Sequence, residues 1–271
     1  MRRLNKCMDD GSKAVKIVVF MKQVPDTEDE RLLDLGTGIL DRQANDNVAD
    51  EITERALEVA LSYRDANKGT QVVVLSVGPD TAQQALRKGL QMGADSAVHV
   101  VDAKLAGADA VQTAHALAAA AKQEGFDLIV AGNESTDGRG GVIPAMVSEI
   151  LGVPLLGSLN EVDIAADSVS GERREESGTA TVFATLPAII SVTERSADAR
   201  FPNFKGIMTA KRKPLQVLSL EALNAGPESL RTYSRVLNAA KRPARTAGVK
   251  IIDEGDAGVK LAEFLAAGHN I

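Results

Sequence analysis

The feature that most constrains this fold is a regular alternation of short β-branched runs with segments of amphipathic helical pattern. Residues 15–20 and 71–77 are apolar runs of the kind that is buried on both faces of a parallel sheet. Further strands are predicted at 96–101 and 127–131, and helices at 49–68, 81–91, 109–124 and 142–151. Strands that alternate with helices of this length predict right-handed crossovers and an α/β fold with a doubly wound parallel sheet.

The second half of the chain follows a different pattern. Apolar runs at 158–164, 169–175, 179–186 and 188–192 are separated by gaps of turn length, which predicts an antiparallel addition to the sheet. Residues 32–41 are expected to form a hairpin. Beyond Thr193 the periodicity fades, and residues 224–271 are expected to be an extended C-terminal arm that ends in a helix at about 256–267. We therefore expect an α/β domain over 14–223, preceded by a polar, disordered leader over 1–13.

Charge and cysteine content narrow the class of function. The formal net charge of -6 argues against a general affinity for nucleic acid. The basic first residues run directly into Asp9 and Asp10 rather than into an apolar stretch, and no apolar run is long enough to cross a bilayer. The single cysteine, Cys7, has no intrachain partner and fits a reducing compartment. We expect a cytoplasmic protein without membrane insertion.

The most informative motif is a glycine-rich loop between a predicted buried strand and a predicted helix. It reads Gly132-Asn133-Glu134-Ser135-Thr136-Asp137-Gly138-Arg139-Gly140-Gly141. In a doubly wound sheet, ligands collect beyond the carboxyl ends of the strands, where a helix start offers free N–H groups to an anion. Glycines let the backbone approach a phosphate closely, and Arg139 adds positive charge. The loop predicts a phosphate site, and the alternative is a flexible connection.

Signatures of several other activities are missing from the sequence. The loop lacks the Gly-Lys-Ser/Thr ending of a Walker motif, and no G-x-G-x-x-G follows the first strand. His99, His115 and His269 have no spacing that pairs them with an acid or a nucleophile, so we assign them structural or surface roles. No metal site and no catalytic residue is predicted. The chain is not expected to be an enzyme with a complete active site of its own.

A series of motifs in chain order resembles the beta subunit of electron transfer flavoprotein, the FixA family. The matching segments begin with Val19-Phe20-Met21-Lys22-Gln23-Val24-Pro25-Asp26 and Asn47-Val48-Ala49-Asp50-Glu51. They continue through Ser76-Val77-Gly78-Pro79, Met92-Gly93-Ala94-Asp95, the glycine-rich loop with Ala131 before it, Leu186-Pro187-Ala188, Ile207-Met208-Thr209-Ala210-Lys211 and Arg245-Thr246-Ala247-Gly248-Val249-Lys250. The resemblance covers nearly everything after the leader.

The resemblance implies that the chain is one half of a heterodimer with an alpha subunit and binds AMP. By position, the AMP pocket would consist of Phe20, Asn47, Val48, Ala49, Asp50, Val77, Ser135, Thr136, Asp137, Gly138, Arg139, Gly140, Gly141, Val142, Ile143, Pro144, Ala145 and Met146. The redox-active FAD would be held mainly by the alpha subunit, with Thr27 and Ala49 of this chain nearest to it. The C-terminal arm would pack on the alpha subunit.

The resemblance further implies that the chain helps to shuttle electrons from flavin dehydrogenases, such as acyl-CoA dehydrogenases, to a membrane quinone reductase. The dehydrogenase would dock on Arg195, Ser196, Ala197, Asp198, Ala199 and Arg200. Ser196 stands where the family usually has a leucine anchor. Docking would therefore be weaker, use another partner or rely on Phe201 and Phe204 instead, and the alternative is a mobile loop without a partner.

Two other functions remain open from the sequence. Some relatives bind a second FAD in place of AMP and bifurcate electrons. A stand-alone nucleotide-binding module of the universal-stress type has a similar strand and helix rhythm, but here the spacing from Gly141 to Gly152 is one residue too long and Val153 replaces the required hydroxyl residue.

Overall fold

The computed structural model describes residues 14–226, 230–245, 248, 250 and 252–268. The chain divides into two compact units, Met1–Asn238 and Ala239–Ile271, which we describe separately. The predicted disordered leader at 1–13, with Cys7, and the terminal His269 lie outside the described residues.

The core of the first unit is a seven-stranded sheet whose strands all pair in parallel. Their order across the sheet is β12-β5-β4-β1-β6-β11-β7. The strands are β1 (Lys16–Phe20), β4 (Gln71–Val77), β5 (Ser96–Val100), β6 (Leu128–Gly132), β7 (Leu155–Leu159), β11 (Ala188–Val192) and β12 (Leu215–Leu218). The predicted doubly wound parallel sheet is confirmed.

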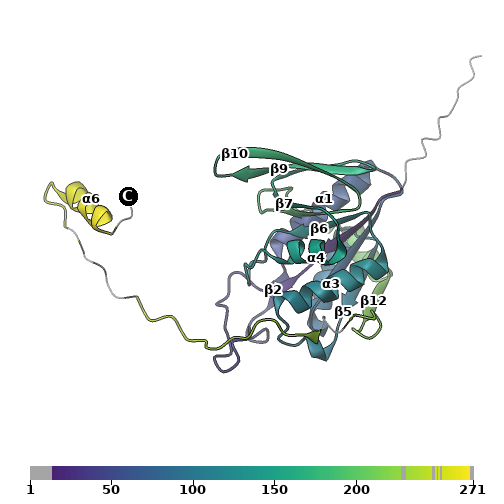
Figure 1. Cartoon of the computed structure of the whole chain (residues 1–271), viewed down its shortest axis with the longest axis horizontal. Helices are drawn as coiled ribbons and strands as arrows, with labels where there is room; N and C mark the ends of the chain where they lie inside the picture. Colours follow the sequence, from purple (N-terminus) through teal and green to yellow (C-terminus); the bar gives the residue numbers. More distant parts are fainter. Residues whose placement is uncertain (1–13, 227–229, 246–247, 249, 251, 269–271) are drawn as a thin grey trace, which may run out of the picture. The chain divides into compact units, whose positions relative to one another are not determined.

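Helices cover both faces of this sheet (Figure 1). The helices are α1 (Glu51–Ala66), α2 (Gln83–Met92), α3 (Ala110–Glu124), α4 (Ile143–Leu151) and the short α5 (Phe204–Ala210), with two 3-10 turns, η1 (Asp80–Ala82) and η2 (Ala103–Leu105). Ile17 and Val19 of β1 are buried on the face covered by α1 and α2. Val18 and Phe20 are buried on the opposite face with α3 and α4, which explains the uninterrupted apolar run of this strand.

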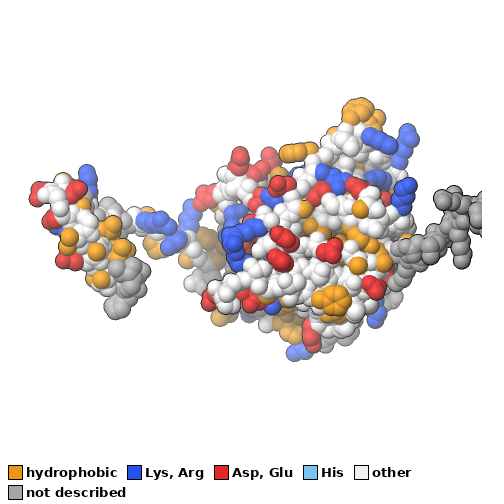
Figure 2. All heavy atoms as spheres, turned by 90° about the horizontal axis from the view of Figure 1, so that it is seen from above, with side chains coloured by type: hydrophobic (Ala, Val, Ile, Leu, Met, Phe, Trp, Pro, Cys, Tyr) orange, Lys and Arg blue, Asp and Glu red, His pale blue; other side chains and the backbone are white. Residues whose placement is uncertain are grey.

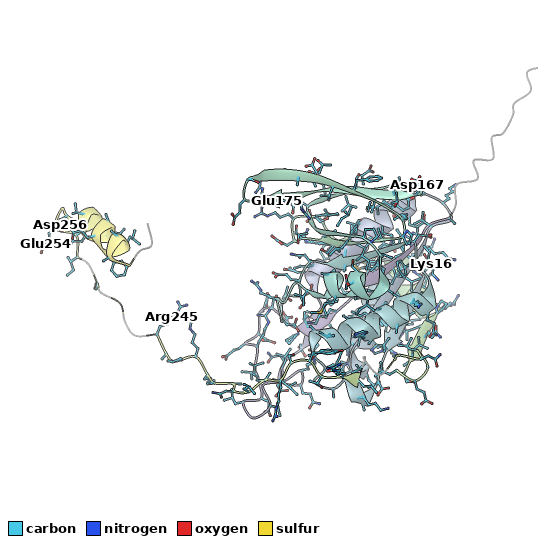
Figure 3. The ribbon with its side chains drawn as sticks, in the orientation of Figure 1. Lys16, Asp167, Glu175, Arg245, Glu254 and Asp256 are labelled. Atoms are coloured by element: carbon cyan, nitrogen blue, oxygen red, sulfur yellow. The ribbon has the colours of Figure 1, made fainter. Side chains whose placement is uncertain are left out.

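The predicted antiparallel addition is present as a separate three-stranded sheet. It consists of β8 (Glu161–Ile164), β9 (Ser168–Glu175) and β10 (Gly178–Thr185), paired in the order β10-β9-β8. Asp167 and Glu175 mark the two ends of β9 in Figure 3. Gly171 is required where β9 pairs with β8, because a Cβ atom there would lie 2.5 Å from the carbonyl oxygen of Glu161.

The prediction was wrong for the two segments at the ends of this region. Residues 188–192 form β11, which lies parallel between β6 and β7 in the main sheet. The predicted strand at 158–164 is divided, because residues 155–159 form β7 at the edge of the main sheet and only 161–164 form β8. The short gap before Ala188 looked like a hairpin turn. All five residues of β11 are buried, however, as in a strand covered on both faces, whereas β8 alternates between exposed and half-buried residues.

Two further elements were missed after residue 193, where the sequence pattern had faded. Helix α5 packs on α2, and β12 adds an edge strand beside β5. The predicted hairpin at 32–41 is present, with a bridge between Leu33 and Leu40. It lies in the connection between β2 (Gln23–Pro25) and β3 (Asn47–Ala49), which pair antiparallel.

The second unit contains the predicted terminal helix, α6 (Ala257–Ala267). Its apolar side chains Val259, Leu261 and Phe264 are exposed. Arg245, Glu254 and Asp256 of this unit are labelled in Figure 3. None of the helices within the described ranges is both long and apolar enough to cross a membrane.

Candidate functional site

The topology of the sheet places one crevice at the carboxyl ends of β1 and β6. From β1 the chain builds outward through β4 to β5, and α3 then carries it back across β1 to β6 on the other side. Such a reversal of strand order leaves a gap between the loops that follow the two central strands, and ligands of open α/β sheets bind there. Here the segments after these strands begin at Met21 and at Asn133.

Asp50 fixes the geometry on one side of the crevice. Its side chain is fully buried and caps α1, because Oδ1 accepts hydrogen bonds from the backbone N–H groups of Ile52 at 3.0 Å and Thr53 at 3.3 Å. Its Oδ2 accepts from the backbone N–H and the hydroxyl of Thr136, at 2.7 and 2.8 Å. The start of α1 and the loop after β6 are therefore held together by one carboxylate.

A second contact ties the same loop to the end of β1. The Lys22 ammonium donates to Ser135 Oγ at 3.0 Å and to Asp137 Oδ1 at 2.7 Å. Burial would raise the pKa of Asp137, but the charge and hydrogen bond of Lys22, with hydrogen bonds from Ser135 and the Gly138 N–H, hold this pKa below its ordinary value. Arg42 lies 3.9 Å from the other oxygen of Asp137. The side chains of Lys22 and Arg42 therefore both lie close to Asp137 in the loop.

The loop itself turns sharply before α4. Arg139 and Gly141 have φ angles of 47° and 63°, in the left-handed region. Helix α4 begins directly after them with no side chain capping it, and Pro144 occupies its first turn. The first N–H groups of α4 therefore face the loop region without a capping side chain, and the helix start is suited to an anion.

Two buried acceptors at the crevice have no hydrogen-bond partner among the described residues. They are Asn47 Oδ1, on β3, and Asn133 Oδ1, at the end of β6. The orientation of Asn47 is fixed, because its amide nitrogen donates to the carbonyls of Arg42 and Asn45, at 2.7 and 3.3 Å. Buried acceptors that are left unpaired cost free energy, so two of them in the segments that form this crevice are consistent with a bound polar ligand.

The structure brings the candidate AMP residues to this one edge of the sheet. Phe20 ends β1 and Val77 ends β4, and both lie on the α3 face, where Ile143 and Met146 pack against the same apolar cluster. The polar part of the pocket comes from β3, Asp50 and the loop. The loop and helix-start residues among the candidates are Ser135, Thr136, Asp137, Gly138, Arg139, Gly140, Gly141, Val142, Ile143, Pro144, Ala145 and Met146.

These residues fit an adenine nucleotide. The buried Phe20 and the half-buried Val77 and Met146 suit a purine ring. The amide oxygens of Asn47 and Asn133 suit its amino group or the ribose hydroxyls. The glycine-rich turn, with Lys22 and Arg42, suits a phosphate. The sequence analysis missed Lys22, Arg42 and Asn133. Asn133 follows β6 directly and Lys22 is the second residue after β1, and this position after a central strand places them at the crevice.

Next to the crevice lies a polar hollow of about 280 Å³. It is lined by Glu51, Ile52, Glu134, Thr136, Arg139 and Glu194. The described residues contain no cluster of three or more His, Cys, Asp or Glu side chains that could hold a metal. His99 is buried in β5, and burial lowers its pKa, which favours the neutral ring and the predicted structural role.

The candidate docking segment at 195–200 is attached to the outer face of α1. The Arg200 guanidinium donates to both carboxylate oxygens of Glu58, at 2.6 and 2.8 Å, and to Asp65 at 2.7 Å. Arg55 donates to Asp198 at 2.8 Å and to the carbonyls of Ser196 and Ala197. Burial would raise the pKa of Glu58, but its hydrogen bonds from Arg200 and Ser62 lower it. The segment is held in place rather than free.

Comparisons with known proteins give a consistent result. The family described as "Electron transfer flavoprotein domain" matches residues 37–223. The chain is 47% identical over 260 residues to "Electron transfer flavoprotein subunit beta" of Mycobacterium leprae, covering 93% of this chain and 97% of that protein. It is 31% identical over 252 residues to the protein of the same name from Megasphaera elsdenii, covering 89% and 93%. It is 30% identical over 241 residues to "Caffeyl-CoA reductase-Etf complex subunit CarD" of Acetobacterium woodii, covering 88% and 92%.

Proposed function

This chain belongs to the electron transfer flavoprotein beta-subunit family, and from that premise we propose that it is the AMP-binding half of a heterodimeric electron carrier. The observation that carries the AMP assignment is the pair of unpartnered amide oxygens of Asn47 and Asn133, beside the cations and the glycine-rich turn at the switch point of the sheet. Buried acceptors without donors are uncommon in native proteins, and a bound nucleotide would supply donors to these two.

The groups in the crevice have structural or ligand-binding tasks in this proposal, and Lys22 has both. Asp50 and Thr136 hold the loop against α1, and Lys22 keeps Asp137 ionised and in place. Lys22, Arg42 and Arg139 balance the negative charge of a phosphate, and Phe20, Val77 and Met146 contact the base. No proton transfer is assigned to any of these residues, because AMP in this site is a structural ligand.

FAD, when bound, supplies the redox chemistry of the heterodimer, and an electron carrier needs proximity and a tuned potential rather than an acid or a base. Of the two positions nearest to the flavin by resemblance, Thr27 is exposed and Ala49 is buried. Both side chains are small, so this chain offers the flavin little contact surface, and we propose that the alpha subunit provides most of the contacts.

We propose further that the heterodimer works in the cytoplasm, receives electrons from flavin dehydrogenases such as acyl-CoA dehydrogenases, and delivers them to a membrane quinone reductase. The dehydrogenase docks in the region of the 195–200 segment. The second unit, with the exposed apolar side chains of α6, packs on the alpha subunit.

A second candidate function is electron bifurcation with FAD in the nucleotide crevice. It rests on the family resemblance, in which some relatives bind a second FAD in place of AMP, and the chain is also 30% identical to a protein named as a subunit of a caffeyl-CoA reductase complex. Analysis of the nucleotide that is released on denaturation separates the two. One AMP per chain supports the carrier, and FAD released from the isolated chain supports bifurcation.

A further inference from the structure

We infer that the dehydrogenase contacts an aromatic patch at the start of α5, formed by Phe201, Phe204, Ile207 and Met208 and called here the α5 patch, rather than the tip of the 195–200 segment. The inference rests on the proposed function, since it locates the docking contact of the same carrier. Its occupant is an apolar pocket with an acidic rim on the dehydrogenase.

The side chains of the α5 patch are exposed to solvent. Phe201 is 94% exposed, Phe204 80% and Met208 56%. Phe204 and Met208 are four residues apart on α5, so they lie on the same side of the helix. Figure 2 shows that exposed hydrophobic side chains also occur elsewhere among charged ones. What distinguishes the α5 patch from the other exposed apolar side chains is the fixed backbone of α5 and the basic side chains around it.

The patch is built on a rigid support. Asn203 caps α5 by accepting from the Gly206 N–H at 2.7 Å. Gly206 lies so close to the end of α2 that a Cβ atom would be 2.2 Å from the Gln91 carbonyl oxygen. Lys213, just after α5, donates to the carbonyls of Leu90 and Ala94 at 2.9 and 2.6 Å. The backbone that carries Phe204 and Met208 is therefore fixed, which limits the conformational entropy lost on binding.

The tip of the 195–200 segment is unsuited to be the anchor. Ser196 and Ala197 face α1 and β8, where they line a hollow of about 480 Å³ together with Val59 and Tyr63. Their carbonyls accept from Arg55, so turning them outward would break these hydrogen bonds. The clamp of Arg200 on Glu58 instead fixes the residue directly before Phe201. The segment therefore positions the patch, and the patch supplies the apolar contact.

Charge defines the chemistry of the occupant. The chain has a net charge of -6, yet the exposed charged side chains within and just after α5 are Lys205, Lys211 and Arg212. An aromatic centre with a basic rim is complementary to an apolar pocket that is rimmed by carboxylates, and opposite charges at a rim raise the rate of encounter.

The test uses the complete heterodimer, reconstituted with its alpha subunit and FAD, and an acyl-CoA dehydrogenase from the same organism as the probe. The variant is Phe201→Ala with Phe204→Ala. The matched control is Phe183→Ala, since Phe183 is 65% exposed on β10, in the separate antiparallel sheet. For each protein, the FAD content, the elution volume and the KM and kcat for flavin reduction by the dehydrogenase are measured.

The double variant is expected to assemble with a full complement of FAD and to raise the KM for the heterodimer by at least about tenfold, with kcat nearly unchanged and the control unaffected. An unchanged KM overturns the inference and leaves the proposed function intact. Failure of the double variant to assemble with the alpha subunit also overturns it, because the patch then belongs to the subunit interface. If the unaltered heterodimer accepts no electrons from the dehydrogenase, the proposed donor fails, and the inference fails with it.

Discussion

The carboxylate of Asp50 and both donors of Thr136 form the joint on which the candidate nucleotide site depends. One oxygen of Asp50 caps α1 while the other accepts the backbone N–H of Thr136 at 2.7 Å and its hydroxyl at 2.8 Å. The two residues are 86 positions apart in the chain. The joint couples the start of a helix on one face of the sheet to a loop that leads into a helix on the other.

Replacement of Asp50 is expected to affect both stability and nucleotide binding. Asp50→Ala removes a buried cap and leaves the donors of Thr136 unpaired, which lowers the free energy of unfolding by about 2–4 kcal/mol. Asp50→Asn retains a good capping residue and serves as the matched control, with a smaller loss of stability. Urea denaturation and the AMP content of both variants check this expectation. Equal stability of Asp50→Ala and the unaltered protein would contradict the role of the joint.

The turn before α4 predicts a difference between two adjacent glycines. Gly141 has a φ of 63°, so Gly141→Ala forces a side chain into the left-handed region at a cost of about 1–2 kcal/mol. Gly140 has no such constraint, and the nearest atom to an added Cβ, a methyl carbon of Val142, is 3.9 Å away. Gly141→Ala should therefore lower the melting temperature and the AMP content, while Gly140→Ala leaves the melting temperature nearly unchanged. Similar melting temperatures for the two variants would show that the turn is not strained in this way.

The pairing of Lys22 with Asp137 predicts an acid dependence. Because the pKa of Asp137 is lowered in the folded protein, its contribution to stability is complete above the ordinary aspartate pKa of about 3.9 and is lost as the pH falls through the lowered value. Lys22→Met removes the main cation, so burial raises the pKa of Asp137 and the acid-dependent loss of stability becomes smaller. If this pKa rises above the ordinary value, the sign reverses, because the ionised carboxylate then destabilises the folded protein at neutral pH and protonation relieves this. Melting temperatures between about pH 3 and 7 test this, with the exposed Lys68→Met as the control. Parallel pH profiles for Lys22→Met and the unaltered protein would rule the pairing out.

Asp109 holds residues 230–238, at the end of the first unit, against the start of α3. Its Oδ1 accepts from the Gln112 N–H at the start of α3, and its Oδ2 accepts from the N–H groups of Tyr233 and Ser234 at 2.7 and 2.8 Å. Asp109→Ala should therefore increase proteolytic cleavage around these two residues and also destabilise α3. Asp109→Asn retains the cap and should increase cleavage with a smaller loss of stability. Unchanged cleavage in both variants would show that the contact does not hold the segment.

The clamp between Glu58 and Arg200 predicts local order in the docking segment. Glu58→Gln weakens a charged pair of hydrogen bonds and should destabilise the protein by about 1–3 kcal/mol. Hydrogen exchange at 195–200 should become faster, while exchange in β1 and β6 stays slow. If hydrogen exchange at 195–200 is equally fast in the unaltered protein and in Glu58→Gln, the clamp does not order the segment.

Much of the architecture could be predicted because its causes are local. The strand at 71–77 has the predicted bounds, and Asp109 caps α3 as its residue type indicates. The placement of β11 could not be predicted, because a gap of two residues after β10 fits a hairpin as well as a return to the main sheet. Helix α5 was missed because it is short and its position is fixed by the close approach of Gly206 to Gln91, a tertiary contact.

The candidate site also has features that the sequence predicts and features that it does not. The glycine-rich loop could be identified from its composition and its place between a strand and a helix, and Asp50 entered through the family resemblance. Neither source predicts that Asp50 and Thr136 meet, or that Lys22 reaches Asp137. These contacts depend on the order of the strands, which brings the ends of β1 and β6 together.

The central claim is that this chain holds AMP by itself and acquires a flavin only with its partner. The most direct test is quantification of the nucleotides released by denaturing the isolated chain, side by side with the heterodimer. The account predicts about one AMP and no FAD per isolated chain, and one of each per heterodimer. Stoichiometric FAD from the isolated chain, or no nucleotide from either preparation, would contradict it.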